Sequence, residues 1–322
     1  MALRKAPNSS MPRHLILTTL AFAALLAALP REPVLALQRP SAAAGPGPSD
    51  APLTDEYRRA FLDRLFANQH ADDAALAMFE RIERRQSREH SSDTTLSEDK
   101  TFRVIPTGTG YWRVLIEDRG RPIPVADYRE QMANVQRALE MTNDPANFDM
   151  RRARERFNAR LKNRAGLISA MRDAFFFNWL GRETRDGRTL LKLRLEPNPN
   201  YKPASRETEL FLHASATVWA DEATAHVVRM EAELTSDFAV GGGLLGKVYR
   251  GSRMTLEQTE VAPGVWMPAV YQYDFSGRKF FFGFEIHERT EANRYERVGP
   301  PSEALALVRR ELSASPTPHV QQ

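Results

Sequence analysis

The sequence predicts an α+β protein in which a curved antiparallel β-sheet forms a half-barrel and helices lie across its concave face. Two observations support this fold class. From residue 175 onwards, apolar and polar residues alternate in about seven consecutive segments, which tight-turn signals separate. Helical spacing of apolar residues occurs before residue 175. Consecutive strands joined by tight turns favour a meander that curls into a barrel or half-barrel.

The region before residue 175 contains four helical patterns and one region of strands. Thr54 offers a capping oxygen and two acidic residues follow it, so the first helix is expected to begin there. A second helix is expected over residues 72–85, because apolar residues recur there at helical spacing. Residues 102–116 alternate instead, which predicts strands. Helical spacing returns at residues 125–139 and again from about residue 148 to 164.

Turn signals divide the region after residue 175 into hairpins. The Asp186-Gly187 pair is among the strongest short hairpin signals. Further turns are expected at Asp221-Glu222, Pro263-Gly264 and Gly277-Arg278. In the segment of residues 188–195, leucines alternate with charged residues, so this strand should be buried on one face only.

The N-terminus has the pattern of a secretory signal peptide. Three basic residues precede an apolar run from Leu15 to Leu29, and Val34-Leu35-Ala36 offers a small-residue cleavage site. The run is about 15 residues long, shorter than the roughly 20 that a membrane-spanning helix needs. Residues 1–36 therefore predict export to the periplasm with cleavage near Ala36. An uncleaved N-terminal anchor is the alternative.

The composition divides the rest of the chain into three parts. Residues 37–53 are rich in Pro, Ala, Gly and Ser and are expected to form a flexible linker. Residues 54–310 are expected to form a single domain with a helical insert at about residues 124–172. Residues 311–322 are expected to form a disordered tail.

Charge and residue content exclude several classes of function. The formal net charge is +4, of which the signal segment contributes +3, so the processed chain is nearly neutral and no nucleic-acid partner is expected. The chain has no cysteine, which excludes disulfides and thiolate chemistry. Neither paired histidine spacing nor a GxSxG serine motif is present. No metal, cofactor or catalytic residue is predicted, and the protein is not expected to be an enzyme.

One glycine-rich segment resembles a phosphate-binding loop only superficially. Residues 241–247 read GGGLLGK, but Val248 stands where such a loop needs a magnesium-binding hydroxyl. The segment also leads into an expected strand, whereas a phosphate loop opens a helix. Its glycines are more consistent with a sharp bend in a curved sheet.

Aromatic and apolar residues share faces of the later strands. Packing in a solid core explains this pattern, but a curved sheet with few helices could also enclose a cavity of lipid size. The candidates for lining such a cavity are Trp112, Val228, Met230, Trp266, Tyr271, Tyr273, Phe275, Phe280, Phe282 and Phe284.

A run of basic residues lies in the helix expected from residue 148. Arg152, Arg156 and Arg160 are candidates for contact with a protein partner or with anionic lipid headgroups. A solvated helix face with counterions explains the same pattern. The run is too weakly amphipathic to insert into a membrane by itself.

An ordered set of short motifs between Asp173 and about Arg294 resembles a known family. After the Asp186-Gly187 turn come PNYKP at residues 199–203, VWAD at 218–221 and VVRME at 227–231. The set continues with GSR at 251–253, EQ at 257–258 and GVWMP at 264–268. In order and spacing these motifs resemble the outer-membrane lipoprotein-sorting family, the Lol-type periplasmic carriers. The long charged helical segment before residue 175 departs from the well-studied carriers.

The resemblance implies an incomplete antiparallel barrel whose concave apolar face accepts acyl chains, with the helices before residue 175 as a lid. The leading hypothesis is therefore a non-enzymatic periplasmic carrier of lipid or lipoprotein acyl chains, with transient contact to a membrane surface. A second hypothesis is an envelope sensor or protein-interaction module with the same fold. A third is a secreted hydrolase whose site the fold assembles. Fold analogy alone does not decide between them.

Overall fold

A computed structural model describes residues 53–240 and 245–314 of the chain. The expected signal peptide, nearly all of the expected linker and residues 315–322 of the expected tail lie outside these ranges, as do four residues of the glycine-rich segment.

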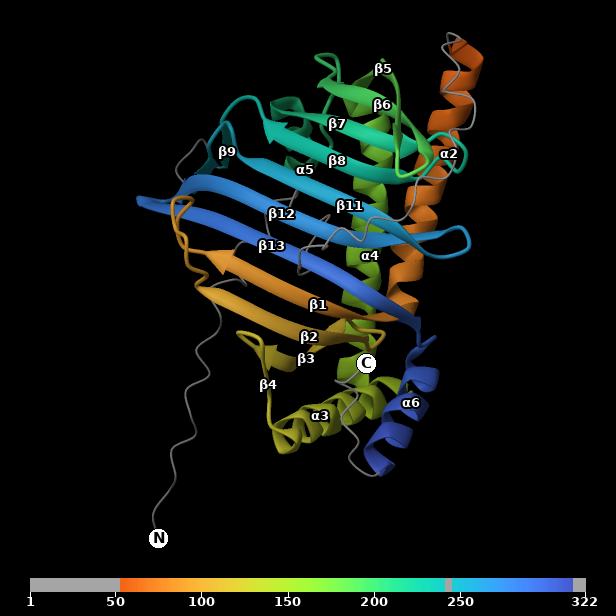
Figure 1. Ribbon diagram of the computed structural model, residues 1–322, viewed down its shortest axis with the longest axis vertical. Coiled ribbons are helices and arrows are strands. Elements are labelled where there is room, and N and C mark those ends of the chain that lie inside the picture. Colours follow the sequence, from red (N-terminus) through yellow and green to blue (C-terminus); the bar gives the residue numbers. More distant parts are fainter. Residues whose placement is uncertain (1–52, 241–244, 315–322) are drawn as a thin grey trace.

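A single antiparallel sheet of thirteen strands dominates the fold (Figure 1). The early strands are β1 (Phe79–Arg88), β2 (Glu98–Pro106), β3 (Tyr111–Asp118) and β4 (Arg121–Pro122). The later strands are β5 (Phe175–Arg185), β6 (Arg188–Pro197), β7 (Ala214–Asp221), β8 (Val227–Leu234), β9 (Phe238–Val240), β10 (Gly246–Val248), β11 (Arg253–Ala262), β12 (Val265–Lys279) and β13 (Phe282–Arg297).

The strand order shows how the chain builds an open half-barrel. The order is β4-β3-β2-β1-β13-β12-β11-β8-β7-β6-β5, with β10 and β9 branching from β12. The first strand therefore pairs with the last, and the two edges of the sheet are β4 and β5. The chain passes from one edge to the other through two helices, so the sheet stays unclosed.

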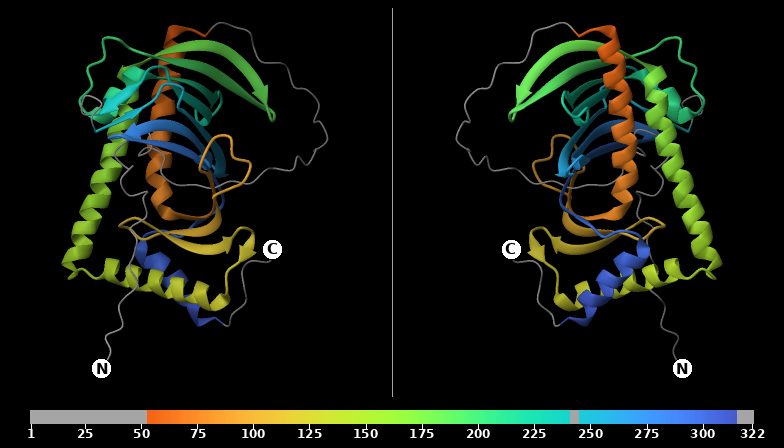
Figure 2. Two further views of the ribbon diagram at one scale, coloured as in Figure 1. Left: turned by 90° about the vertical axis from the view of Figure 1, so that its left-hand side faces the viewer. Right: turned by 90° about the vertical axis from the view of Figure 1, so that its right-hand side faces the viewer.

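Over residues 53–240 and 245–314, five α-helices and two short 3₁₀ turns accompany the sheet. They are α2 (Asp55–Ala75), η2 (Leu76–Met78), α3 (Val125–Asn143), α4 (Phe148–Ala174), α5 (Arg206–Glu209), η3 (Leu210–His213) and α6 (Pro301–Ser313). Figure 2 shows α2 and α4 side by side over one face of the curved sheet, which is its concave face. Helices α3 and α6 pack together beside β2 and β3. None of the helices in the described ranges is both long and apolar enough to cross a membrane.

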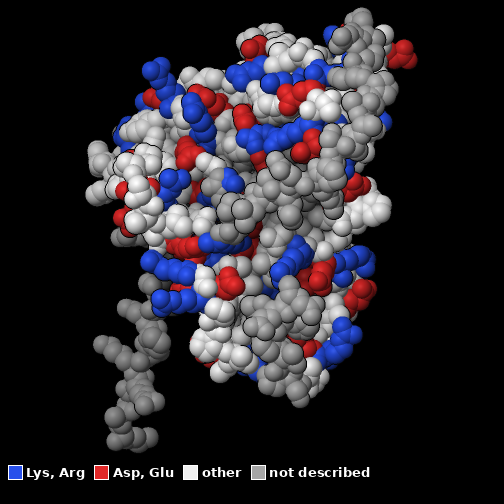
Figure 3. All heavy atoms as spheres, viewed as in Figure 1, with Lys and Arg blue, Asp and Glu red and all other residues white. Residues whose placement is uncertain are grey.

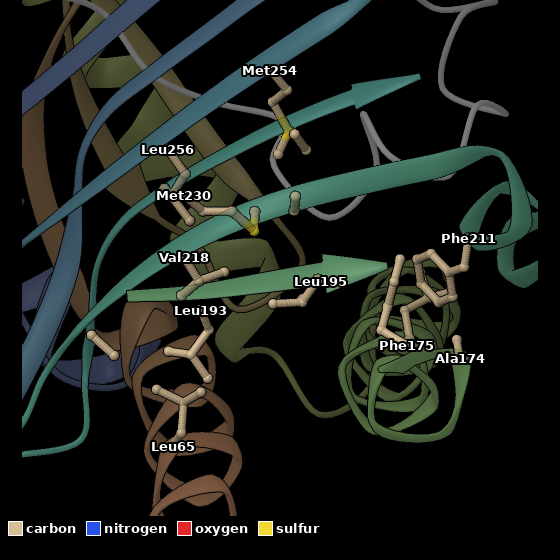
Figure 4. Packing of buried hydrophobic residues seen from close by; sticks show 14 of the residues in the cluster. Leu65, Ala174, Phe175, Leu193, Leu195, Phe211, Val218, Met230, Met254 and Leu256 are labelled. Atoms are coloured by element: carbon tan, nitrogen blue, oxygen red, sulfur yellow. The ribbon is translucent and has the colours of Figure 1, made fainter. Parts of the chain in front are cut away.

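The main core lies between the two long helices and the concave face. Phe61 and Leu65 of α2 and Leu167 of α4 pack against inward-facing residues of the strands, including Leu193 and Met230. Figure 4 shows Leu65 directed at the side chains of β6 and β7. A second, smaller core joins α3 and α6 to β2 and β3. The predicted α+β half-barrel with helices over its concave face is thus confirmed.

The face turned away from the helices is charged. Arg229 of β8 contacts Glu231 on its own strand and Glu257 on the neighbouring strand β11, and Arg84 of β1 contacts Asp99 of β2. Figure 3 shows rows of basic and acidic side chains running over this face. Exposed pairs of this kind add little stability individually, on the order of 0–1 kcal/mol each, but they keep the outer face polar.

Several predicted turns are confirmed. At Asp186-Gly187 both residues have positive φ, +51° and +76°, which a two-residue hairpin turn between β5 and β6 requires. Gly264 has φ +71° in the turn between β11 and β12. The interruption of the helices near Pro145 separates α3 from α4 as expected.

The expected helix over residues 72–85 is wrong. Helix α2 continues to Ala75, and after one 3₁₀ turn the chain enters β1 at Phe79. Phe79, Arg81 and Glu83 alternate inward along this strand. Because two of the three inward residues are charged, the alternation of period two was hidden in the sequence.

The expected turn at Gly277-Arg278 is also wrong, because β12 continues through it to Lys279. Gly277 lies where β10 and Phe284 approach the strand closely. A Cβ atom at Gly277 would lie 2.3 Å from the carbonyl oxygen of Lys247 and 2.7 Å from the Phe284 ring. The glycine therefore allows strand packing rather than a turn.

The start of the expected disordered tail needs correction as well. Residues 311–313 belong to α6, which packs on α3. Glu311 accepts hydrogen bonds from Arg103 of β2 and from Tyr128 of α3. The structure therefore continues beyond the expected domain end at residue 310.

Candidate functional site

The candidate site is the space between α2, α4 and the concave face of the sheet. Alternation along β6, β7, β8, β11 and β12 directs one apolar residue in two towards this space. Helix α2 contributes Phe61, Leu65 and Phe66, and α4 contributes Ile168 and Met171. The surroundings are therefore predominantly apolar, with Gln69 of α2 and Gln258 of β11 as the polar exceptions.

An apolar cavity of about 80 Å³ remains inside this space. Its lining consists of Leu65, Phe66, Gln69, Ile168, Met171, Phe177, Leu193, Leu195, Val218, Val227, Met230, Leu256, Gln258, Pro268 and Tyr271. The cavity is much smaller than the roughly 300–1,000 Å³ of typical small-molecule sites. In this conformation the helices fill most of the concave face.

Aromatic contacts line the side of the space near β5. The rings of Phe66 and Phe177 meet edge to face with centroids 5.9 Å apart. Phe61 and Trp179 form a similar pair at 5.8 Å. Such pairs are worth roughly 0.5–1.5 kcal/mol beyond the area that they bury. They hold α2 against the edge strand, together with the guanidinium of Arg58, which lies 5.9 Å from the centre of the Trp179 ring.

A buried charged cluster borders the other side of the space. Arg81 of β1 is 1% exposed and forms an ion pair with Glu83, in which Nη2 and Oε1 are 2.7 Å apart. Arg113 of β3 also contacts Glu83, at 3.0 Å between Nε and Oε2. The guanidinium of Arg81 lies 4.8 Å from the centre of the Tyr111 ring. Burial raises the pKa of Tyr111, and the nearby Arg81 opposes that rise.

The two long helices are tied to each other by ion pairs. Arg164 of α4 contacts Asp73 near the C-terminal end of α2. Farther along the two helices, Arg172 of α4 contacts Asp63 of α2. Burial raises the pKa of Asp73, although Arg164 opposes the shift. The pair of helices is therefore linked both by charge and through the apolar core.

Helix α2 is tied to the sheet mainly at the turn between β7 and β8. The Asn68 side-chain amide donates to the backbone carbonyls of Thr224 and Ala225, at 2.8 and 3.0 Å. The hydroxyl of Tyr57 donates to Glu222, with an O–O distance of 3.2 Å. These few polar contacts hold α2 against that turn, at Tyr57 near the start of the helix and at Asn68 in its second half.

The inner end of α2, which is its C-terminal turn, is fixed by the buried carboxylate of Asp72. Oδ1 of Asp72 accepts a hydrogen bond from the backbone N–H of Trp266, at 3.0 Å, and Oδ2 lies 3.7 Å from Nε2 of His226. Burial raises the pKa of Asp72 to about 6, which the hydrogen bond from Trp266 only partly offsets. Burial lowers the pKa of His226.

The structure brings four of the candidate cavity residues into the main core. Met230 and Tyr271 line the cavity itself. Tyr273 is buried beside Tyr271, with ring centroids 6.4 Å apart, and Phe275 packs against Tyr273. Burial raises the pKa of both tyrosines.

Val228 and Trp266 line a different hollow. It is an open groove of about 680 Å³ beside the turns β5–β6 and β11–β12. The Trp266 ring is stacked between His226, at 5.3 Å, and the guanidinium of Arg188, at 5.0 Å. Arg188 itself pairs with Asp221 and Glu260, so the groove is polar and mixed in charge.

The remaining candidates lie away from the cavity. Trp112 is 38% exposed on β3. Phe280 and Phe282 are exposed at the far end of the β12–β13 hairpin. Phe284 packs on a small core with Leu210 and Phe238.

The candidate basic residues lie on an exposed face of α4. Arg152 stacks on Phe148 and Arg160 stacks on Phe157, with guanidinium-to-ring distances of 4.9 and 5.7 Å. Arg160 also donates to the carbonyl of Thr109, at 3.4 Å. Arg156 is exposed between them.

Sequence reasoning missed the residues that the helices contribute to the site. Leu65, Phe66, Ile168 and Met171 recur at helical spacing, but nothing in that spacing shows which surface they cover. Leu193 belongs to a strand whose alternation was recognised and could have been included on that signal. Within residues 53–240 and 245–314, no group of three or more His, Asp and Glu side chains is placed to hold a metal ion.

Comparisons with known proteins were made against families, curated proteins and solved structures. No family model and no curated protein matches the chain. Similar solved structures include a LolA superfamily protein from Nitrosomonas europaea, with 12% identity over 77% of this chain and 96% of that one and a TM-score of 0.29.

Two further solved structures are similar to the chain. An outer membrane lipoprotein-sorting protein domain from Vibrio parahaemolyticus is 8% identical over 72% of this chain and 91% of that one, with a TM-score of 0.29. A DUF1329 family protein from Desulfovibrio piger is 12% identical over 74% and 92%, with a TM-score of 0.27.

Proposed function

We propose that the protein binds an apolar ligand, such as an acyl chain of a lipid or lipoprotein, between its two long helices and the concave face of the sheet. The observation that carries this proposal is the continuous apolar lining that six strands and two helices direct at one space. Burial of ligand surface there would contribute about 25 cal/mol per Å². The ligand would be bound and released without a covalent step, so the protein acts as a carrier and not as an enzyme.

The size of the cavity implies that the helices move on loading. A cavity of about 80 Å³ cannot enclose a long acyl chain. In this proposal the described conformation is the closed form, in which α2 and α4 cover the concave face. Opening requires α2 to separate from the β7–β8 turn, where Asn68 and Tyr57 make the polar contacts. A ligand that stabilises the open form shifts the population towards it.

The first 36 residues support a location for the carrier. Their signal-peptide pattern is consistent with export of the processed protein to the periplasm, where a carrier would move ligand between membrane surfaces or envelope proteins. The motifs between residues 173 and 294 that resemble lipoprotein-sorting carriers favour the same ligand class.

A lipid extraction followed by a titration tests the proposal. The chain from residue 37 onwards, which contains every described residue, is purified and extracted for mass spectrometry, and then titrated with a fluorescent fatty acyl probe. We expect co-purified lipid or saturable probe binding. Absence of both would overturn the carrier function.

The exposed basic face of α4 favours a second candidate, an envelope interaction module. Arg152, Arg156 and Arg160 are solvent-accessible and lie outside the cavity lining. Replacing the three together with glutamine should leave probe binding unchanged if the carrier function holds. If a purified acidic envelope partner loses binding to this variant while the wild type never takes up the probe, the second candidate is favoured.

A further inference from the structure

Three consecutive phenylalanines form the tip of the β12–β13 hairpin. Phe280 and Phe281 make the two-residue turn, and Phe282 opens β13. Their exposed fractions are 47%, 89% and 78%. In Figure 1 this hairpin reaches past the ends of its neighbours β11 and β1. We refer to Phe280–Phe282 as the aromatic tip.

The backbone of the aromatic tip is held in a conformation that favours other residues. Phe280 has φ +52°, a left-handed conformation that glycine, asparagine or aspartate usually adopts in such turns. Nη1 of Arg278 donates to the Phe280 carbonyl at 3.0 Å and holds the turn. A bulky aromatic residue thus stands at a position that penalises it, and about half of its surface stays exposed in the described fold.

More apolar surface lies next to the aromatic tip. Leu245 is 53% exposed, and its carbonyl accepts a hydrogen bond from the backbone N–H of Phe280. Tyr249, just after β10, is 37% exposed. Leu245 thus adds exposed apolar surface beside the aromatic tip, and Tyr249 adds more at this end of the molecule, farther back, where its backbone N–H donates to the carbonyl of Ser276. Exposed apolar residues grouped at one end in this way are typical of an interaction surface.

Basic residues surround the aromatic tip. Lys279 precedes it, Arg278 holds its turn, Lys247 lies in the neighbouring strand β10 opposite Arg278, and Arg250 follows that strand. Asp237 is the acidic residue that pairs with Lys247. The collar around the apolar end is therefore positively charged.

We propose that the aromatic tip inserts into the interfacial layer of a phospholipid bilayer that carries anionic headgroups. Exposed aromatic side chains with flanking Lys and Arg match the two layers of such a surface, because the rings enter the acyl boundary while the charges contact the headgroups. Charge complementarity thus selects an anionic lipid surface over a second copy of this chain, whose own tip would carry the same positive collar.

This contact is independent of ligand binding in the cavity. None of the tip residues contributes to the lining of the cavity. Loss of membrane contact and loss of ligand uptake can therefore be measured separately, and failure of one leaves the other standing.

Vesicle binding tests the proposal. The chain from residue 37 onwards is mixed with vesicles of phosphatidylcholine alone, or of an equimolar mixture with phosphatidylglycerol, and bound protein is separated by flotation. We expect binding to the anionic vesicles that weakens with salt. The variant Phe281→Ser/Phe282→Ser should bind roughly tenfold to a hundredfold more weakly, whereas Phe176→Ser, an exposed aromatic on β5, should bind like the wild type.

A spectroscopic variant reports insertion directly. Phe281→Trp should retain binding, shift its tryptophan emission to shorter wavelength on anionic vesicles and be quenched by brominated acyl chains. Equal binding of the wild type and the double serine variant, or no emission shift, would overturn the proposal. So would self-association that the double serine variant abolishes while the wild type binds neither vesicle.

Discussion

Among single residues, Asp72 couples the stability of the closed site to pH. Its carboxylate is 5% exposed and fixes the inner end of α2 to the first residues of β12. Because burial raises its pKa from 3.8 to about 6, the folded state binds a proton more readily than the unfolded state. The stabilisation from this proton is complete below about pH 4 and is lost as the pH rises through about 6.

Replacing Asp72 with asparagine should therefore make the protein more stable at neutral pH. Asparagine keeps an oxygen for the Trp266 N–H and removes the buried charge, with a gain of at most roughly 3 kcal/mol. Urea unfolding at a series of pH values measures the difference between variant and wild type, which should grow between about pH 4 and 6. His226 has the opposite effect on the stability of both proteins, because burial lowers its pKa and favours the folded state at higher pH. This effect is common to the variant and the wild type and cancels in the difference between them. A difference that does not vary with pH would contradict the assignment to Asp72.

At the scale of elements, the sequence predicted those strands and helices whose inward faces are apolar. Strand β6 was recognised because leucine alternates with charged residues, and all four of its leucines are buried. Strand β1 was not, because Arg81 and Glu83 point inward and conceal its period. The hairpin turn of β12–β13 was misplaced because Gly277 resembles a turn residue but serves close packing.

The candidate site was predictable only in part, because alternation shows which residues share a face of a strand but not which helix covers that face. Met230 and Tyr271 follow from the alternation of their own strands. Phe280 and Phe282 share the expected face, but β12 extends beyond the helices that cover the site, so these residues end outside it. Which helix covers which strand depends on contacts between residues far apart in the chain, and the sequence pattern does not contain that information.

The buried ion pair between Arg81 and Glu83 of β1 leads to a testable prediction about stability. Glu83→Gln should destabilise the protein by about 3–5 kcal/mol, because it leaves Arg81 buried without its carboxylate. The matched control is Arg113→Gln, which removes the more exposed partner of Glu83 and should cost less than about 1 kcal/mol. Chemical unfolding monitored by circular dichroism compares the two. An equal loss in the free energy of unfolding for both variants would contradict a larger contribution from the buried Arg81–Glu83 pair.

For the whole molecule, the order of the elements along the chain explains how α2 could move away from the concave face while the strands stay paired. Strand β1 pairs with β13, so the two free edges are β4 and β5, and the chain crosses between them through α3 and α4. Helix α4 is continuous with the edge strand β5, whereas α2 precedes β1 and meets the sheet through its own side chains. Movement of α2 therefore exposes the concave face without breaking the sheet.

A covalent lock on α2 tests this account most directly. The chain has no native cysteine, so Asn68→Cys/Thr224→Cys places two thiols where α2 contacts the β7–β8 turn. The variant is titrated with the fluorescent acyl probe before and after the thiols are bridged by oxidation or a short bifunctional reagent. We predict saturable binding with free thiols, loss of binding once they are bridged, and recovery when an oxidised bridge is reduced. Equal probe affinity in the bridged and free forms would contradict ligand entry beneath α2.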